Sequence, residues 1–193
     1  MPVTDVKQNT VEYGLCNVFY SLATYNSETE KYTYATPKRL PGAVTLTLSA
    51  VGQMDKFYAD NIAYYTTETN GGYEGDIELA NLPNDFRTEI LGEKFDDNGI
   101  LLESSEAIKK EFALLFQFEG DVTQKKHILY RCAASRPEIS SSTKEDKATY
   151  NKRKLSITSM ARKNDKFIKG EAAEGSTNYA AFFDTVQEPS FAG

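Results

Sequence analysis

The feature that most constrains the fold is an alternation of apolar and other residues with a period of two. EFALLFQFEGD, residues 111–121, has a large apolar side chain at every second position: Phe112, Leu114, Phe116 and Phe118. AVTLTLSA, residues 43–50, alternates apolar with hydroxyl side chains. Successive side chains of a strand point to opposite faces, so both stretches are predicted strands with one face toward a core. Similar runs recur along the chain without the strand–helix–strand alternation of a parallel sheet. We therefore predict a mainly β protein: an antiparallel β-sandwich or partial barrel with one or two short α-helices.

Two polar segments interrupt this pattern. Residues 25–42 and 137–153 show little apolar patterning, and each is long for a connection inside a compact domain. The remaining sequence, in a chain of 193 residues with 40% hydrophobic content, has no composition shift that would mark a domain boundary. We predict one domain over residues 1–193 with two long loops, at 25–42 and 137–153.

Two turn signals lie in the stretch from residue 56 to residue 79. Asp60-Asn61 separates KFYAD from IAYYTTE, and Asn70-Gly71-Gly72 precedes the next strand-like run. Asn, Asp and Gly are the residues that tight turns favour. This region is therefore predicted to form short strands joined by two turns.

A short helix is predicted for NLPNDFRTEILG, residues 81–92. Its large apolar residues, Phe86, Ile90 and Leu91, share one side. Gly92 is well placed to end the helix, because glycine tolerates the left-handed conformation of a C-terminal cap.

A second helix is predicted for NYAAFFDTV, residues 178–186. Asn178 is a favourable N-terminal cap. The i, i+3, i+4, i+7 spacing predicts one buried face made of Tyr179, Phe182, Phe183 and Val186. We expect this face to pack on the β core or on a neighbouring subunit.

The strand-like run GYEGDIEL, residues 72–79, carries a row of carboxylates on one face: Glu74, Asp76 and Glu78. Residues i and i+2 of a strand lie roughly 6.5 Å apart, so these side chains form a row and not a cage. One row does not supply the six or more oxygens that calcium requires. Two carboxylates at this spacing are compatible with a glycosidase, but the neighbouring aromatic Tyr73 points to the other face. A solvated strand face, a repulsive lining and a carboxylate-based hydrolase remain as interpretations.

The other chemically reactive residues do not form a recognisable catalytic or metal motif. His127, the single histidine, lies in an apolar strand-like run and is interpreted as a packed or interface residue. Cys16 and Cys132 are far apart in apolar runs and are predicted to be buried free thiols. Residues 96–99, DDNG, begin like a calcium loop but lack the closing glutamate, so they are predicted to form a turn. We predict no enzymatic activity, no cofactor and no metal.

The net charge of −6 argues against a surface built to hold nucleic acid by phosphate contacts. The N-terminal MPVTDVKQ lacks the basic and apolar regions of a signal peptide, and no window reaches the apolar length of a membrane span. These features predict a soluble protein made in a cytoplasm, with no membrane partner.

A set of sequence blocks occurs in a distinctive order along the chain: GLCNVFYSLAT, LPGAVTLTLS, FYADNIAYYTT, GYEGDIELANLPNDFRTEILG, FALLFQFEGD, HILYRCAASRP and a terminal YAAFFDTV. This order resembles the major tail proteins, or tail tube subunits, of phages and prophages of Gram-positive bacteria with long, non-contractile tails. The resemblance extends from about Tyr13 to Val186. Its most distinctive blocks are FYADN, GYEG-x-(I/L)-E and FAL-x-F-x-x-(E/D)GD.

The resemblance implies a structural virion protein with a β-sandwich or partial barrel flanked by a helix. Such subunits form homo-hexameric rings that stack into the tube through which phage DNA is ejected. In that family extended arms and a long loop join the rings, so residues 25–42 and 137–153 become candidate assembly loops. The implied partners are other copies of the chain, a tape measure protein inside the tube, a tail terminator and distal tail proteins. Assembly would take place in the host cytoplasm, and DNA would pass without specific binding.

A DNA conduit gives the carboxylate row a role. Lysine and arginine contacts hold DNA by releasing counterions, whereas carboxylates repel its phosphates. A charge of −6 per subunit becomes −36 per hexameric ring (6 × −6). Glu74, Asp76 and Glu78 are therefore the candidate lining of the lumen.

Two other function classes remain open from the sequence. A carbohydrate-binding β-sandwich module needs an exposed aromatic platform, and in a chain without Trp the candidate is Tyr64-Tyr65. A carboxylate-based hydrolase would use members of the acidic row.

Overall fold

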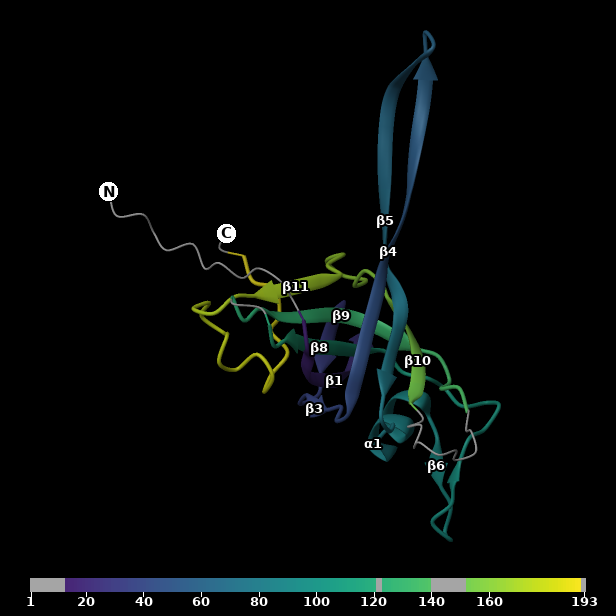
Figure 1. Ribbon diagram of the computed structural model, residues 1–193. Helices are drawn as coiled ribbons and strands as arrows, with labels where there is room; N and C mark the ends of the chain where they lie inside the picture. Colours follow the sequence, from purple (N-terminus) through teal and green to yellow (C-terminus); the bar gives the residue numbers. More distant parts are fainter. Residues whose placement is uncertain (1–12, 121–122, 140–151, 192–193) are drawn as a thin grey trace, which may run out of the picture.

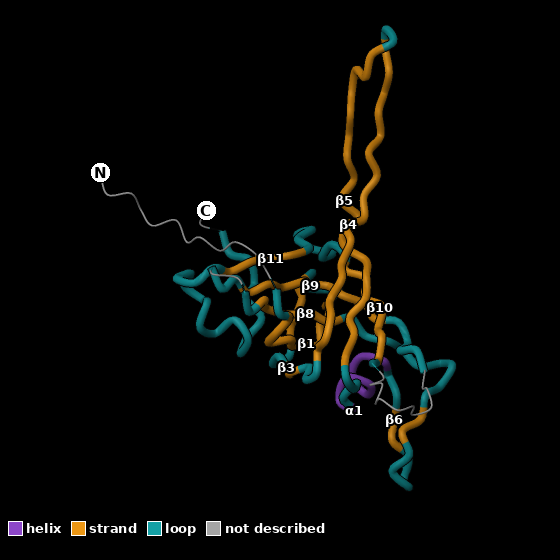
Figure 2. The backbone as a smooth tube through the Cα atoms, viewed as in Figure 1, coloured by secondary structure: helices purple, strands orange, loops and turns teal. Residues whose placement is uncertain are grey.

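The computed structural model describes residues 13–120, 123–139 and 152–191. Its regular structure is almost entirely antiparallel strand, which confirms the predicted fold class (Figures 1 and 2). The strands are β1 (Leu15–Asn26), β2 (Lys31–Tyr34), β3 (Lys38–Arg39), β4 (Ala43–Ala59), β5 (Ile62–Leu79), β6 (Lys94–Phe95), β7 (Leu101–Leu102), β8 (Phe112–Phe118), β9 (Lys126–Ala134), β10 (Arg153–Ser159) and β11 (Lys169–Ala172). A single helical turn, α1 (Asn84–Phe86), continues directly into a short π-helix, η1 (Arg87–Leu91).

Nine strands form one sheet in the order β2-β1-β8-β9-β10-β5-β4, with β3 paired to β1 and β11 paired to β9. β6 and β7 form a separate two-stranded ribbon. Within the described residues, β2 and β4 end the path of paired strands, so the sheet does not close into a barrel.

The main core lies between the β1-β8-β9 part of the sheet and the β10-β5 part. Its largest fully buried side chains come from strands in both parts and from the helical segment: Tyr20, Ile77, Leu79, Phe86, Ile90, Phe112, Leu114, Leu155 and Ile157. Phe86 packs edge-on against both Tyr20 and Phe112, with ring centroids 4.9 and 5.4 Å apart. These contacts fix the helical segment on the curled sheet.

A second core covers the other face of β8 and β9. It contains Ala113, Leu115, Ile128, Tyr130, Phe182 and Val186. β8 is therefore buried on both faces, with Phe112 and Leu114 in the main core and Ala113 and Leu115 in the second. The predicted core strand is confirmed, and its second buried face explains the unbroken apolar run FALLF.

The predicted helix at 81–92 is confirmed in a shortened form. Phe86, Ile90 and Leu91 are buried, and Gly92 ends the segment in a left-handed conformation. The predicted C-terminal helix over 178–186 is wrong, because these residues form a series of turns. The turns still bury Phe182 and Val186, while Tyr179 and Phe183 are half-buried.

The polar segment 25–42 is not a structureless loop. It contains the end of β1, all of β2 and all of β3, and both short strands pair with β1. Tyr32 is buried, and Asn26 accepts backbone hydrogen bonds from Glu28 and Thr29 in the connecting turn. Most of the second segment, residues 140–151, lies outside the described residues.

The turn expected at Asn70-Gly71-Gly72 is also wrong. β5 runs through these residues without reversing, and Gly71 is an extra residue in the ladder between the pairs Val51–Gly72 and Gly52–Asn70. The turn at Asp60-Asn61 is confirmed, with φ of 52° and 61° at its two residues. β4 and β5 are consequently one long hairpin that projects far from the rest of the molecule (Figure 1).

Candidate functional site: an exposed arm and a groove at its base

The long hairpin divides into two parts that we name by their residues. The base comprises residues 43–51 and 71–79, and the arm comprises residues 52–70. In the base, β5 is paired on one side with β4 and on the other with β10. The pairing with β10 ends at Tyr73–Ser159, so the arm begins where the third strand stops.

Gly72 occupies the junction between base and arm. Its φ is +97°, and a Cβ at this position would lie 2.0 Å from the backbone oxygen of Ser159. Its N–H donates a 3.0 Å hydrogen bond to the side-chain oxygen of Asn70. A residue without a side chain therefore allows β5 to pass the end of β10 and to continue into the arm.

The arm is an antiparallel ladder that continues through Gln53–Thr69 and Asp55–Thr67 to the pair Phe57–Tyr65. The side-chain hydroxyl of Thr69 accepts a hydrogen bond from the Gln53 N–H and donates one to the Gln53 carbonyl, which supports the ladder next to the extra residue. In the described part of the chain no third strand pairs with the arm. An isolated two-stranded hairpin is at best marginally stable in water.

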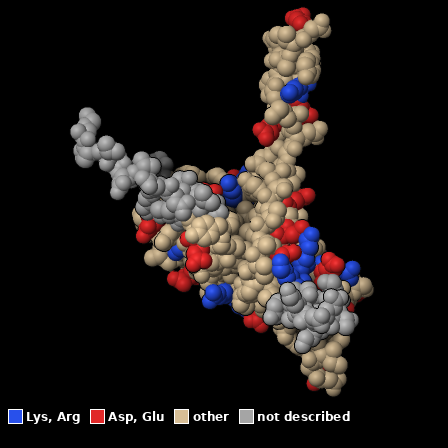
Figure 3. Space-filling view, viewed as in Figure 1, with Lys and Arg blue, Asp and Glu red and all other residues tan. Residues whose placement is uncertain are grey.

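The arm exposes large apolar side chains. Six of them are between 57% and 71% exposed: Met54, Phe57, Tyr58, Ile62, Tyr64 and Tyr65. Figure 3 shows that charged residues are sparse along the arm. A concentration of exposed apolar side chains on a projecting element marks an interaction surface.

The apolar side chains lie on both faces of the arm. Phe57 and Tyr65 are direct cross-strand partners and share one face. Met54 and Tyr58 have the other parity in β4 and therefore point to the opposite face. Neither face is covered by another element among the described residues.

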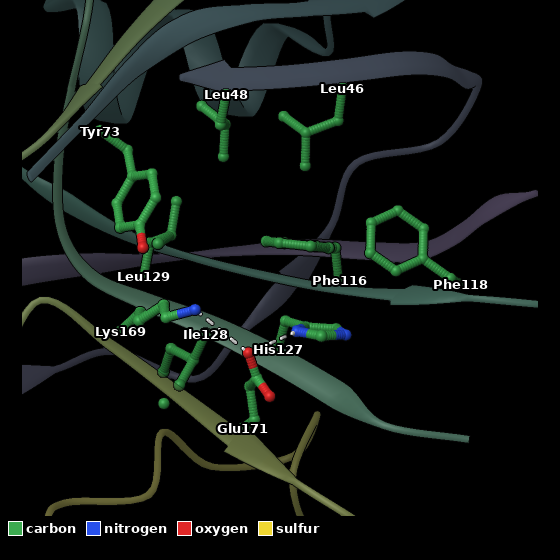
Figure 4. Close-up of a pocket in the computed structure, with 11 residues that line it drawn as sticks. Leu46, Leu48, Tyr73, Phe116, Phe118, His127, Ile128, Leu129, Lys169 and Glu171 are labelled. Atoms are coloured by element: carbon green, nitrogen blue, oxygen red, sulfur yellow. Dashed lines mark hydrogen bonds and ion pairs between the residues drawn. The ribbon is translucent and has the colours of Figure 1, made fainter. Parts of the chain in front are cut away.

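An apolar groove lies beneath the base of the hairpin (Figure 4). Leu46 and Leu48 of β4 and Tyr73 of β5 form one wall, and β8 and β9 form the other with Phe116, Phe118 and Leu129. The cavity has a volume of about 280 Å³ and is open to solvent. The groove is therefore a second apolar surface, connected to the arm by the same two strands.

Polar residues lie along one side of the groove. Lys169 donates a 3.3 Å hydrogen bond to Glu171, and this bond is the main reason that the pKa of Lys169 is raised. The His127 Nδ1 lies 3.7 Å from the same carboxylate, and its ring stacks on Phe116 with centroids 5.2 Å apart. This packing supports the interpretation of His127 as a packed residue.

Glu74, Asp76 and Glu78 lie together on the outward face of the base, between β4 and β10. Lysines interrupt the acidic row, since Asp76 pairs with Lys154 at 2.9 Å and Glu78 pairs with Lys152 at 2.9 Å. Figure 3 shows basic and acidic side chains intermixed over this region. Two ammonium groups against three carboxylates leave one net negative charge, so the row is less repulsive than its sequence suggests.

Hydrogen bonds hold two carboxylates of the row in their charged forms. Ser156 donates to Asp76 at 2.6 Å, and this bond, followed by the one from Lys154, lowers the pKa of Asp76. Lys152 and then Thr45 lower the pKa of Glu78. A glycosidase acid needs a raised pKa, so the environment of this pair is the opposite of what general-acid catalysis requires.

The C-terminal residues that were predicted to form a buried face pack on the sheet of the same subunit. Phe182 and Val186 cover Leu115 and Ile128, and Phe183 stacks on Phe19 with ring centroids 4.9 Å apart. The C-terminal segment is further held by Glu188, which pairs with the buried Arg162 at 2.7 Å. The C-terminal segment therefore packs on β8 and β9 of its own subunit.

Cys132 is buried and Cys16 is half-buried, both as free thiols, and burial raises the pKa of Cys132 to about 12. Across residues 13–120, 123–139 and 152–191, no group of three or more His, Cys, Asp or Glu side chains is placed to hold a metal ion. None of the helices in these ranges has the length and apolar character needed to cross a membrane.

No protein-family model and no curated protein sequence matches this chain. The function proposed below accordingly depends on the geometry of the arm and on the sequence resemblance.

Sequence reasoning named Tyr64 and Tyr65 only as a platform for carbohydrate, and it did not find the arm. Aromatic density was the available signal, because residues 57–65, FYADNIAYY, contain four aromatic residues around the Asp60-Asn61 turn. The sequence predicted subunit contacts elsewhere, at residues 25–42 and 137–153 and at the C-terminal face of residues 178–186.

Proposed function

We propose that the protein is a structural subunit that assembles with copies of itself, as a tail tube protein of a phage or prophage with a long, non-contractile tail. In this proposal homo-hexameric rings stack into the tube through which DNA is ejected. The observation that carries self-assembly is the arm, an apolar hairpin exposed on both faces. The sequence resemblance, which covers nearly the whole chain, narrows self-assembly to a tail tube.

The arm supports assembly for an energetic reason. Burying apolar surface contributes roughly 25 cal/mol per Å², and the arm leaves six large apolar side chains in water. A monomer gains nothing from such an element, whereas contact with another subunit buries it. The mainly β fold is compatible with the β-sandwich that the resemblance implies.

The alternatives receive less support from the geometry. A carbohydrate platform needs several rings on one face, and here Phe57 and Tyr65 share a face while Tyr58 points to the opposite one. A hydrolase that used Asp76 and Glu78 would need one of these carboxyls to be a proton donor, and both have lowered pKa values.

The acidic row keeps its role as candidate lumen lining in a modified form. Lys152 and Lys154 would reduce its repulsion of DNA, while Thr45 and Ser156 add hydroxyl groups beside it. We propose a polar and weakly negative lining in place of a strongly negative one.

Electron microscopy and sedimentation velocity of the purified full-length protein over a range of concentrations test the proposal. Rings or tubes of uniform diameter are the expected result. A protein that stays monomeric at every concentration, and that does not occur in phage particles from the source that encodes it, would overturn the proposal.

A further inference from the structure

Two apolar surfaces of this chain, the arm and the groove, lack a covering element within the described residues. Each subunit has one of each, and both are built from β4 and β5. We infer that the Phe57–Tyr65 face of one subunit's arm inserts into the groove of a second subunit. The inference rests on the proposed function, since both require self-association, and it goes further by naming the two surfaces that meet.

The size of the groove matches this face of the arm. A cavity of about 150 Å³ accommodates one benzene ring, so the 280 Å³ of the groove corresponds to about two rings. Phe57 and Tyr65 offer two rings side by side, because they are direct cross-strand partners. The aromatic wall formed by Phe116 and Phe118 provides surfaces for edge or offset ring contacts.

Charge favours the Phe57–Tyr65 face over the opposite one. Asp55 lies two residues from Phe57 and is the charged residue of this face, whereas the opposite face carries both Lys56 and Glu68. The side chain of Lys169 is 52% exposed beside the groove. An arm seated with Phe57 in the groove can bring Asp55 toward Lys169, whose ammonium group also contacts Glu171 at 3.3 Å.

The arm projects away from the rest of its own subunit (Figure 1), whereas the groove lies at the base of the hairpin. Residues 52–59 of β4 span about 26 Å as an extended strand, so the tip is held well away from the base. The occupant that this geometry favours is a second copy. In the proposed ring each arm enters the groove of the next subunit and no two subunits exchange arms, so the contact is heterologous and repeats around the ring.

Disulfide trapping in the full-length protein tests the contact directly. Tyr65→Cys on the arm and Leu46→Cys in the groove are combined in one chain that also carries Cys16→Ser, and assembled protein is treated with a mild oxidant. The expected result is a ladder of covalently linked species that extends beyond the dimer. The matched control, Tyr58→Cys with Leu46→Cys, changes the opposite face of the arm and should give no ladder.

Single-cysteine chains distinguish the possible arrangements. Tyr65→Cys alone and Leu46→Cys alone should give no linked species, and their mixture should give linked dimers only. Dimers from Tyr65→Cys alone would mean that arms pair with each other. A linked monomer of the double variant would mean that the arm folds onto its own groove. Either outcome overturns the inference.

A second measurement does not depend on disulfide geometry. Combined Phe57→Ser and Tyr65→Ser should raise the concentration needed for assembly by about 30-fold or more, the effect of losing an interface hot spot. Combined Met54→Ser and Tyr58→Ser should have a smaller effect, and the reverse order would overturn the inference. If the parent assembles but no Tyr65–Leu46 link forms, the inference fails and the proposed function stands. If the parent does not assemble, the proposed function itself fails.

Discussion

The base and the arm of the hairpin are made of the same two strands, yet they differ in how their side chains are covered. In the base, Ile77 and Leu79 are buried in the main core, and β10 pairs with the outer edge of β5. In the arm, Phe57 and Tyr65 are paired across the strands and still more than 60% exposed. Backbone pairing therefore specifies the shape of both regions, but burial in a core stabilises only the base. This difference supports the proposal that the arm contacts a surface outside its own subunit.

The largest expected difference between the two regions comes from truncating one aromatic side chain in each. Phe112→Ala, in the main core, should lower the free energy of unfolding by about 3–5 kcal/mol, because it removes a fully buried ring. Phe57→Ala should change it by no more than about 0.5 kcal/mol, because the ring is already in water.

Urea unfolding of dilute, monomeric protein measures both values. A loss of more than about 1 kcal/mol for Phe57→Ala in the monomer would show that the arm packs within its own subunit. Such a result would remove the distinction between base and arm.

The junction between the regions is the next most sensitive point. Gly72→Ala should cost about 2 kcal/mol or more, because it combines a left-handed φ with a Cβ that would lie 2.0 Å from the Ser159 oxygen. Gly71→Ala is the matched control, since its Cβ would lie 3.0 Å from the nearest atom.

Thermal unfolding of the two variants beside the parent gives the comparison. Equal melting temperatures for Gly72→Ala and Gly71→Ala would contradict the role of Gly72 as the residue that lets β5 pass the end of β10.

The smallest expected effect concerns pH and the surface of the base. Ser156 and Lys154 lower the pKa of Asp76 from its ordinary value of 3.8. Because the folded-state pKa lies below the unfolded value, this stabilisation is complete above the unfolded pKa and is lost as pH falls through the folded pKa.

Lys154→Ala should therefore shift the Asp76 titration upward, and its effect on melting temperature should shrink as the pH is lowered into the acid range. NMR titration of the Asp76 carboxyl provides the measurement. Lys56→Ala, on the arm, is the surface control and should leave that titration unchanged. An unchanged titration in Lys154→Ala would show that this ion pair does not form in solution.

Much of the fold could be predicted because the side-chain period of a strand is local information. The alternation in residues 43–50 and the apolar run at 112–118 predicted β4 and β8 directly. The length of the β4–β5 hairpin could not be predicted in this way, because Asn70-Gly71-Gly72 has the composition of a turn. Only the contact with Ser159 shows why residue 72 is a glycine: it lets the β5 backbone pass close to the end of β10, and it does not reverse the chain.

For residues 178–186 the sequence correctly predicted burial but not the conformation of the chain. The spacing of Phe182 and Val186 correctly predicts that both are buried, but several chain paths bring residues four apart to one surface. A nine-residue segment is shorter than the 12–15 residues at which an isolated helix becomes marginal, and Phe, Thr and Val are modest helix formers. Packing on β8 and β9 therefore decides its conformation, and the turns satisfy that packing.

In the candidate site, too, features within one strand could be predicted, whereas contacts between distant segments could not. The carboxylate row could be predicted, because Glu74, Asp76 and Glu78 are consecutive in one strand face. The pairing of this row with Lys152 and Lys154 could not be predicted, because these lysines lie just before and within β10, more than 70 residues later in the chain. The groove is lined by residues of β4, β5, β8, β9 and β11, so no local sequence pattern predicts it.

Replacement of the arm is the most direct test of the central claim, that the arm exists for contact with another subunit. Val51 and Gly72 are cross-strand partners, so residues 52–71 can be replaced by the two-residue turn Asn-Gly while residues 43–51 and 72–79 of the base are retained. The account predicts a folded monomer whose melting temperature matches that of the dilute parent and which forms neither rings nor tubes in electron micrographs. Normal rings or tubes from the shortened chain would contradict the account.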